Sequence, residues 1–263
     1  MNARIGAYPK SVVSFLQGFT MGGGVGLGCH ASHRIVGESA QVAMPECAVG
    51  LVPDVGGSAL LARAPGRIGD YLGTTGARMG PGDALLAGFA DHYVPEQGWP
   101  ALKADLVAAG DVAAVHAAAR AAPEGRLAAA QGEIDRLFGA ATLNGIVDGL
   151  ETSPGEFAVE TLRALRRAAP LSAAVTVEML RRLRPAPTLR DALRQEYRFT
   201  FRALDQSDFL EGIRAAIIDK DRKPRWRHPS PEAVTAQDVA AMLAPLGDNE
   251  LELDRRASCR ERV

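Results

Sequence analysis

Three consecutive glycines, Gly22 to Gly24, constrain the fold of the first part of this chain more than any other feature. They follow the apolar segment 11–16 (SVVSFL), and small residues continue after them to residue 28. This pattern predicts a strand, a glycine turn and the start of a helix. Glycines leave backbone N–H groups open to a ligand, and the N-terminus of a helix attracts negative charge. The stretch is therefore expected to hold an oxygen atom that carries negative charge.

Two carboxylates, Glu46 and Asp54, follow the glycine run, each directly after a proline. A straight helix between them would hold them about 12 Å apart. The prolines and glycines around them favour turns instead, so both carboxylates could face one pocket. The alternative for Asp54 is structural, because it precedes the helical pattern at 58–63 and could cap that helix.

Other catalytic motifs are missing from the sequence. The glycine run lacks both a G-x-G-x-x-G pattern with a following acid and Gly-Lys-Ser/Thr, so it does not match the nucleotide-binding motifs. The G-x-S-x-G motif of serine hydrolases is also absent. His30 and His33 have no third ligand nearby in sequence, whereas zinc sites use three or four, so we expect His33 to form a hydrogen bond or face solvent. Carboxylate chemistry without a metal remains.

The three cysteines, Cys29, Cys47 and Cys259, have no metal-ligand spacing. Such sparse use suits a reducing compartment, and Cys29 and Cys47 are expected to be small, buried packing residues. The 263 residues include 30 Lys and Arg against 31 Asp and Glu, which gives no reason to expect a nucleic acid or a membrane as a partner. No apolar run reaches the roughly 18 to 20 residues of a membrane span, and the first ten residues lack the apolar region of a signal peptide. A cytoplasmic location is therefore expected.

Short strands and helices are predicted to alternate through the first third of the chain. The pattern predicts strands at 11–16, 33–36, 41–44 and 91–94, the first of them almost at once after the start, and helices at 58–63, 67–75 and 82–88. From Pro100 onward the pattern is almost entirely helical, with breaks at 123–125 and 153–155.

Two helices of the second half have clear patterns. An apolar residue at every fourth position predicts a helix over 170–183, with a face made of Leu171, Val175, Met179 and Leu183. Another helix is predicted from Leu189. It carries three aromatic residues that are expected in the core: Tyr197, Phe199 and Phe201.

Three segments of the first hundred residues resemble a known family. These are MGGGVGLGCHASHRIV from Met21, AMPECAVGLVPDVGG from Ala43 and TGARMGPGDALLAGFADHYVP from Thr75, and they are similar to the crotonase (enoyl-CoA hydratase/isomerase) superfamily. The block from Leu193 to His228 contains EGIRAAIIDKD, which is typical of the 3-hydroxyisobutyryl-CoA hydrolase branch and is lacking in general hydratases. The resemblance extends from about residue 8 to residue 253, and 110–154 match only loosely.

The resemblance implies an α/β fold, a crotonase-like ββα spiral followed by a helical C-terminal region. Residues 1–98 would form a partial spiral core with the active-site loops, 99–253 a helical lid and oligomer interface, and 254–263 a non-native tail. In the family, a strand-rich segment precedes the equivalent of Tyr8 and supplies one oxyanion-binding N–H. The chain is therefore expected to be truncated at its N-terminus or to have its true start upstream.

The resemblance also implies an activity, the hydrolysis of a short β-hydroxyacyl-CoA thioester such as 3-hydroxyisobutyryl-CoA from valine breakdown. Gly23, with its neighbour Gly22, would bind the thioester carbonyl oxygen through a backbone N–H. Glu46 would activate water as a general base or attack as a nucleophile, and Asp54 would hold the substrate hydroxyl or the water and tune Glu46. Coenzyme A would be part of the substrate, with no other cofactor and no metal, and a homo-oligomer is expected.

Two alternatives stay open at this point. The first is an enoyl-CoA hydratase or isomerase, although typical hydratases carry two glutamates of which only one is matched here. The second is an inactive, truncated fragment that binds an acyl-CoA weakly.

Overall fold

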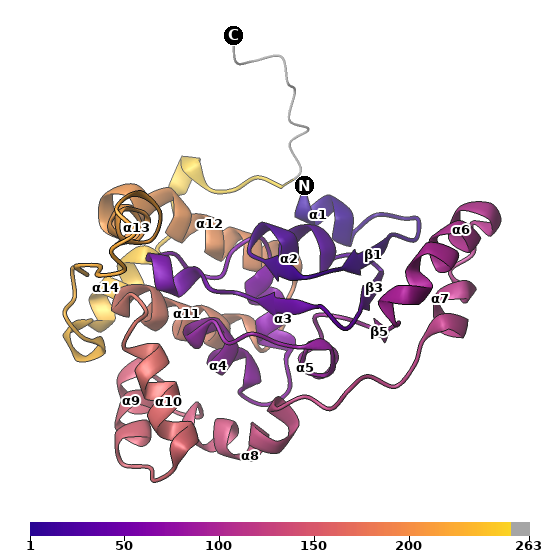
Figure 1. Cartoon of the computed structure of the whole chain (residues 1–263). Helices are drawn as coiled ribbons and strands as arrows, with labels where there is room; N and C mark the ends of the chain where they lie inside the picture. Colours follow the sequence, from indigo (N-terminus) through magenta and orange to yellow (C-terminus); the bar gives the residue numbers. More distant parts are fainter. Residues whose placement is uncertain (254–263) are drawn as a thin grey trace.

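The computed structural model describes residues 1–253 of the chain. The strands of this part are short and form two parallel sheets (Figure 1). One sheet has the order β1-β3-β5, with β1 at Val13–Leu16, β3 at His33–Val36 and β5 at His92–Tyr93. The other pairs β2 (Phe19–Met21) with β4 (Gln41–Ala43). Strands of successive turns of the chain therefore lie side by side in parallel, as the predicted ββα spiral requires.

Helices connect the strands of the spiral. Between β2 and β3 lies α2 (Gly23–Gly28). The connection from β4 to β5 consists of η1 (Glu46–Val49), α3 (Gly57–Arg63), α4 (Ile68–Thr75) and α5 (Pro81–Leu86). The predicted helices at 58–63, 67–75 and 82–88 are confirmed within one or two residues.

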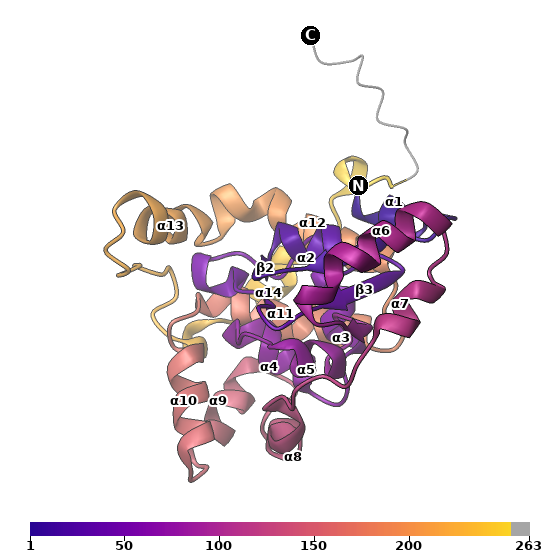
Figure 2. The ribbon, with the colours of Figure 1, turned by 45° about the vertical axis from the view of Figure 1, so that its right-hand side comes forward.

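The remainder of the described chain is helical, as predicted. Its elements are η2 (Glu96–Gly98), α6 (Trp99–Ala109), α7 (Ala113–Ala118), α8 (Leu127–Leu137), α9 (Leu143–Glu151), α10 (Glu156–Leu165), α11 (Pro170–Leu183), α12 (Leu189–Gln206), α13 (Phe209–Ile213), the π-helical turn η3 (Arg214–Ile218), η4 (Pro231–Ala233), α14 (Ala236–Met242) and η5 (Gly247–Asn249). Figure 2 shows α6 and α7 on the side of β3, away from α9 and α10. Trp99, Leu102 and Val115 form a small separate core there with Ile35 and Val94.

Helix α11 lies at the centre of the main core, where it packs against α3 and α4. It spans the residues that the sequence predicts, and its predicted apolar face is fully buried: Leu171, Val175, Met179 and Leu183. The main core contains residues from both sides of residue 98. The proposed division at that point stays a prediction.

Two expectations from the sequence were wrong. The strand expected at 11–16 is present as β1, but the chain does not enter it almost at once, because α1 (Asn2–Gly6) precedes it and packs against α2 and α12. The aromatic stripe of α12 is also not a common face: Phe199 is fully buried, whereas Phe201 is 49% exposed. Residues two positions apart in a helix point about 200° apart, so this spacing cannot keep all three rings in the core.

The expected tail at 254–263 lies outside the described residues. Among the helices of residues 1–253, none combines the length and the apolar character needed to cross a bilayer.

Candidate active site

Glu46 lies against the glycine turn that precedes α2. It is the first residue of η1, and its side chain is only 7% exposed. A Cβ atom built on Gly22 would lie 3.1 Å from the Glu46 Oε1 atom. The Oε2 atom is buried and has no hydrogen-bond partner among the described residues. One carboxylate oxygen of Glu46, Oε1, therefore lies close to the predicted oxyanion-binding turn, and the other, Oε2, is buried without a hydrogen-bond partner among the described residues.

The backbone of this turn requires glycine at residue 22. Gly22 precedes α2 with φ 48° and ψ −115°, a conformation that other residues avoid. Gly23 is exposed and has open space on its Cβ side, so a ligand can approach its backbone. The first N–H groups of any α-helix have no partner within the helix. The geometry is thus compatible with the oxyanion role predicted for Gly22 and Gly23, which stays a prediction.

The glycines further along α2 permit close packing on the segment that carries Asp54. A Cβ atom at Gly26 would lie 2.7 Å from the Cβ atom of Val55. Val55 itself has φ 53°, which is rare for a β-branched residue. Its carbonyl oxygen accepts hydrogen bonds from His30 Nε2 at 2.9 Å and from the side-chain amide of Asn2. The turn that follows Asp54 is therefore held from the side of α2.

Asp54 is half-buried and does not cap α3. Its backbone carbonyl accepts a hydrogen bond from the Gly57 N–H at 2.7 Å, and among the described residues no side chain next to the start of α3 caps that helix. Instead, Glu196 of α12 accepts from the Gly56 N–H at 2.8 Å and from the Ser58 N–H at 3.2 Å. The cap alternative for Asp54 is therefore wrong, since a distant carboxylate performs that role.

Sequence reasoning missed Glu196. Its signal is its position on the buried face of α12, where it is flanked at helical spacing by Ala192, Phe199 and Ala203, all of them buried. A charged residue in such an apolar row is rarely buried without a partner, and it marks a site to examine.

Burial raises the pKa values of three carboxyl groups in this region. Burial raises the pKa of Glu46 to about 8, and the charges of Asp54 and Glu196 raise it as well. Burial raises the pKa of Glu196 to about 7, although hydrogen bonds from Ser58 and Gly56 act in the opposite direction. Burial also raises the pKa of Asp54. Glu46 can therefore gain or lose a proton near neutral pH, as an acid-base catalyst must.

The histidine pair does not come together. His30 donates to the Val55 carbonyl, whereas His33 lies beside Ser32, with its Nδ1 atom 3.0 Å from the serine oxygen, as expected for a hydrogen-bonding residue. Within residues 1–253, no group of three His, Cys, Asp or Glu side chains is arranged to hold a metal ion. Cys29 and Cys47 are buried as predicted, and burial raises the pKa of each thiol to about 12.

The C-terminal block, residues 193–228, packs through α13 against η1, the turn that begins with Glu46. A Cβ atom at Gly212 in α13 would overlap the Val49 carbonyl oxygen of η1. Within the block, the Arg214 guanidinium forms ion pairs with Glu211 at 2.8 Å, with Asp219 at 2.6 Å and with Asp221 at 2.8 Å. These contacts fold the block back on itself and give it a shape that fits η1.

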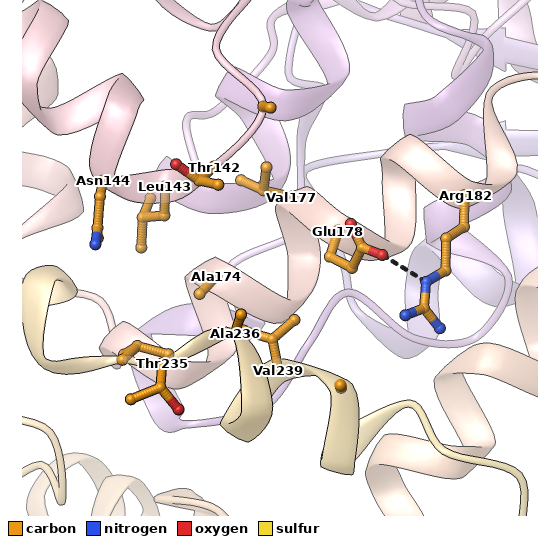
Figure 3. Close-up of a pocket in the computed structure, with 13 residues that line it drawn as sticks. Thr142, Leu143, Asn144, Ala174, Val177, Glu178, Arg182, Thr235, Ala236 and Val239 are labelled. Atoms are coloured by element: carbon orange, nitrogen blue, oxygen red, sulfur yellow. Dashed lines mark hydrogen bonds and ion pairs between the residues drawn. The ribbon is translucent and has the colours of Figure 1, made fainter.

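A separate pocket of about 420 Å³ lies between α9, α11 and α14 (Figure 3). It is mostly apolar, with the Glu178–Arg182 ion pair at one end. Its lining residues are Ala141, Thr142, Leu143, Asn144, Ala174, Val177, Glu178, Arg182, Val234, Thr235, Ala236, Val239 and Ala240. None of the predicted site residues belongs to it.

The parallel strands wound in a spiral, with a buried carboxylate beside a glycine turn, define an enzyme of the crotonase type. The chain belongs to the enoyl-CoA hydratase/isomerase family, whose model matches residues 1–243.

The similar proteins are named as three kinds of acyl-CoA enzyme. The mitochondrial 3-hydroxyisobutyryl-CoA hydrolase of Xenopus tropicalis is 35% identical over 264 residues, which cover 96% of this chain and 68% of that protein. The same enzyme of Gallus gallus is 37% identical over 95% of this chain and 67% of its own length. Among solved structures, an enoyl-CoA hydratase from Rhodobacter sphaeroides 2.4.1 is 64% identical with a TM-score of 0.92, over 95% of this chain and 73% of that one. A carnitinyl-CoA dehydratase from Mycobacterium thermoresistibile is 40% identical with a TM-score of 0.90, over 96% of this chain and 73% of that one.

Proposed function

We propose that this protein hydrolyses a short β-hydroxyacyl-CoA thioester, with 3-hydroxyisobutyryl-CoA as the expected substrate and valine degradation as the expected pathway. The observation that carries the proposal is the Glu46 carboxyl group, which is buried against Gly22 and has one oxygen without a partner within residues 1–253. The relatives named 3-hydroxyisobutyryl-CoA hydrolase support the choice of substrate. Those relatives are named as mitochondrial, so the cytoplasmic location stays a prediction.

The Gly23 N–H is the proposed donor to the thioester carbonyl oxygen. As the carbonyl carbon becomes tetrahedral, this oxygen gains negative charge, and a donor fixed in advance by the backbone stabilises it without reorganisation. One such donor typically contributes about 2.7 to 4 kcal/mol in the transition state. The exposed position of Gly23 leaves room for the acyl group to approach.

Glu46 would supply the attacking group by one of two routes. As a general base, its carboxylate takes a proton from water while the water oxygen forms a bond to the carbonyl carbon. As a nucleophile, its own oxygen forms that bond and gives an acyl anhydride, which water then hydrolyses. In both routes the C–S bond breaks, coenzyme A leaves as a thiolate and is protonated, and Glu46 is ionised at the start.

Asp54 is the proposed partner of Glu46. It is close enough to raise the pKa of Glu46 by its charge, and it is partly open to solvent. We assign it to the β-hydroxyl group of the substrate or to the attacking water. Such a contact would fix the orientation of the acyl chain over Gly23 and favour β-hydroxyacyl over simple acyl groups.

Enoyl-CoA hydration is the second candidate, because the solved structure that is 64% identical carries the name enoyl-CoA hydratase. Typical hydratases use two glutamates. Here α2 contributes none, since it consists of Gly23, Gly24, Val25, Gly26, Leu27 and Gly28. Asp54 would have to act as the second acid in such a reaction.

Two assays test the proposal. One follows the release of free coenzyme A from 3-hydroxyisobutyryl-CoA with a thiol reagent, and the other follows the hydration of crotonyl-CoA. We expect release of the thiol, and loss of that release in Glu46→Gln. The exposed Glu124→Gln is the matched control and should retain full activity. Hydration without thiol release would overturn the proposal in favour of the hydratase, and no turnover of either substrate would favour the inactive fragment.

A further inference from the structure

Glu196 makes an unusual set of contacts for a carboxylate. It is 2% exposed, and it reaches from α12 to the N-terminus of α3, which lies about 140 positions earlier in the chain. Three donors converge on it: the Gly56 N–H at 2.8 Å, the Ser58 N–H at 3.2 Å and the Ser58 hydroxyl. All three come from a single short segment, so the position of that segment depends on this carboxylate.

The segment held by Glu196 contains a strained turn. Val55 has φ 53° and Gly56 has φ 83°, and only the glycine adopts such a value without steric cost. A conformation of this kind persists only when its surroundings determine it. Here the surroundings are Glu196 on the Gly56 N–H and the His30 and Asn2 side chains on the Val55 carbonyl. Asp54 directly precedes this turn, so the turn decides where its carboxylate points.

We propose that Glu196 is a positioning residue of the active site: it holds the strained turn after Asp54 and thereby fixes the Asp54 carboxylate relative to Glu46. The inference rests on the proposed thioester hydrolysis. Glu196 touches neither substrate nor reacting atoms, since its oxygens are occupied by the α3 donors.

The same carboxylate also acts on Glu46 through its charge. The charges that act on Glu46 are those of Asp54 and Glu196, and Asp54 also acts on Glu196. His30, which binds the Val55 carbonyl, has a pKa that burial and the charges of Arg63 and Arg34 lower. The charge of Glu196 raises the pKa of Glu46. Removal of that charge should therefore move the titration of Glu46 to lower pH, which a purely structural residue would not do.

The test is the Glu196→Gln variant, assayed for coenzyme A release across pH. A glutamine amide would meet one of the α3 N–H groups donor to donor, so the turn should shift. We expect kcat to fall by up to about 100-fold, as displacement of a catalytic group by about 1 Å can cause. KM should change less than about twofold, and the midpoint of the pH profile should move to lower pH. An unchanged kcat and midpoint would overturn the proposal.

The matched control is Glu250→Gln. Glu250 is a carboxylate that also binds α12, through an ion pair with Arg198 at 2.8 Å, and its second oxygen accepts from the Leu246 N–H at 3.0 Å. The Glu250→Gln substitution should leave kcat and the midpoint of the pH profile unchanged. An equal effect of Glu250→Gln would show that general loosening of α12 is responsible and would overturn the specific role of Glu196.

Two further measurements keep the inference testable on its own. Ser58→Ala removes one donor with little risk to folding and should lower kcat to a smaller extent, so it decides the question if Glu196→Gln does not fold. Carbon-13 NMR of labelled glutamate carboxyl groups gives the titration of Glu46 without any substrate. If wild type releases no coenzyme A, the proposed function fails, and the inference still stands or falls on whether Glu196→Gln moves the Glu46 titration to lower pH.

Discussion

The Oε1 atom of Glu46 lies 3.1 Å from the point where a Cβ atom would sit on Gly22. The carboxylate therefore faces a stretch of backbone that only glycine can form, because Gly22 has φ 48° and ψ −115°. The Glu46 carboxylate thus lies directly beside the Gly22 backbone. Any side chain at residue 22 would displace Glu46 from the turn whose N–H groups are the proposed oxyanion donors.

Gly22→Ala should abolish activity while leaving most of the fold intact. The new methyl group would lie 3.1 Å from the Glu46 Oε1 atom, so the carboxylate would have to shift by a few tenths of an ångström, and the backbone would be strained by about 1 to 3 kcal/mol. We expect coenzyme A release to fall by at least about 100-fold, since small displacements of catalytic groups have effects of that size. The control is Gly132→Ala on α8, where a Cβ atom has no neighbour within 4 Å. Equal activity of both variants would contradict the site geometry.

The free energy of unfolding should fall as pH rises through the titration of Glu46. Its pKa in the folded chain is about 8, above the ordinary value of 4.5, so the folded state binds more protons than the unfolded state between these values. Stability is therefore greatest near the lower end of this range, and Glu196, with a pKa of about 7, acts in the same direction. Glu46→Gln removes the buried charge and should be more stable than wild type at about pH 9. Urea denaturation of both proteins at about pH 5 and about pH 9 provides the measurement.

The comparison of wild type with Glu46→Gln also tests whether burial perturbs the pKa of Glu46. If wild type and Glu46→Gln lose stability equally between the two pH values, the burial of Glu46 is not what perturbs its titration. Glu124→Gln serves as the exposed control and should follow wild type at both pH values.

Asp54→Asn should lower turnover and shift its pH dependence. Because the proposed hydrolysis requires ionised Glu46, kcat/KM of wild type should rise with pH and level off above about 8, the pKa of that group. The charge of Asp54 raises the pKa of Glu46, so kcat/KM of Asp54→Asn should level off at a lower pH than that of wild type. Its value on the plateau should also be smaller. Steady-state kinetics across pH measure both effects. A profile identical to that of wild type would remove Asp54 from the site.

Gly212→Ala should reduce coenzyme A release, because the C-terminal block supports the turn that carries Glu46. Its methyl group would overlap the Val49 carbonyl, a backbone atom that cannot rotate away, so η1 and Glu46 would be displaced. Overpacking of this kind typically costs about 1 to 3 kcal/mol of stability, and we expect a clear loss of coenzyme A release. Gly149→Ala on α9 is the control, because its Cβ would make an ordinary contact of 3.7 Å with Leu137. Full activity of Gly212→Ala would show that the block does not support the Glu46 loop.

Much of the fold follows from local patterns. The strand at 33–36 and the helix at 170–183 have the predicted bounds, since each is defined by a regular arrangement of apolar residues and by breaks at its ends. Strand β2 was missed because its three residues are too few to show alternation and lie between glycines. Helix α1 was missed because it depends on packing with α2 and α12, which no local pattern records.

The site was predictable only where its residues are neighbours in sequence. The glycine turn and Glu46 lie on consecutive turns of the spiral, and a motif of small residues and prolines indicates both. Glu196 meets Ser58 across 138 positions, through the packing of α12 on α3, so no spacing rule connects them. For Asp54, the sequence allowed a helix cap, but the positive φ of Val55 and Gly56 turns the chain before α3 begins.

The Arg214 ion pairs have a consequence for the way such proteins are recognised. They join acids that lie within ten positions of one another, and none of them is Glu46 or Asp54. In this chain the EGIRAAIIDKD block therefore contributes its shape, which supports η1, and it supplies neither of the two acids proposed to act in catalysis. A match to this block alone would therefore report how the loop is supported, whereas the proposed chemistry lies at residues 46 and 54.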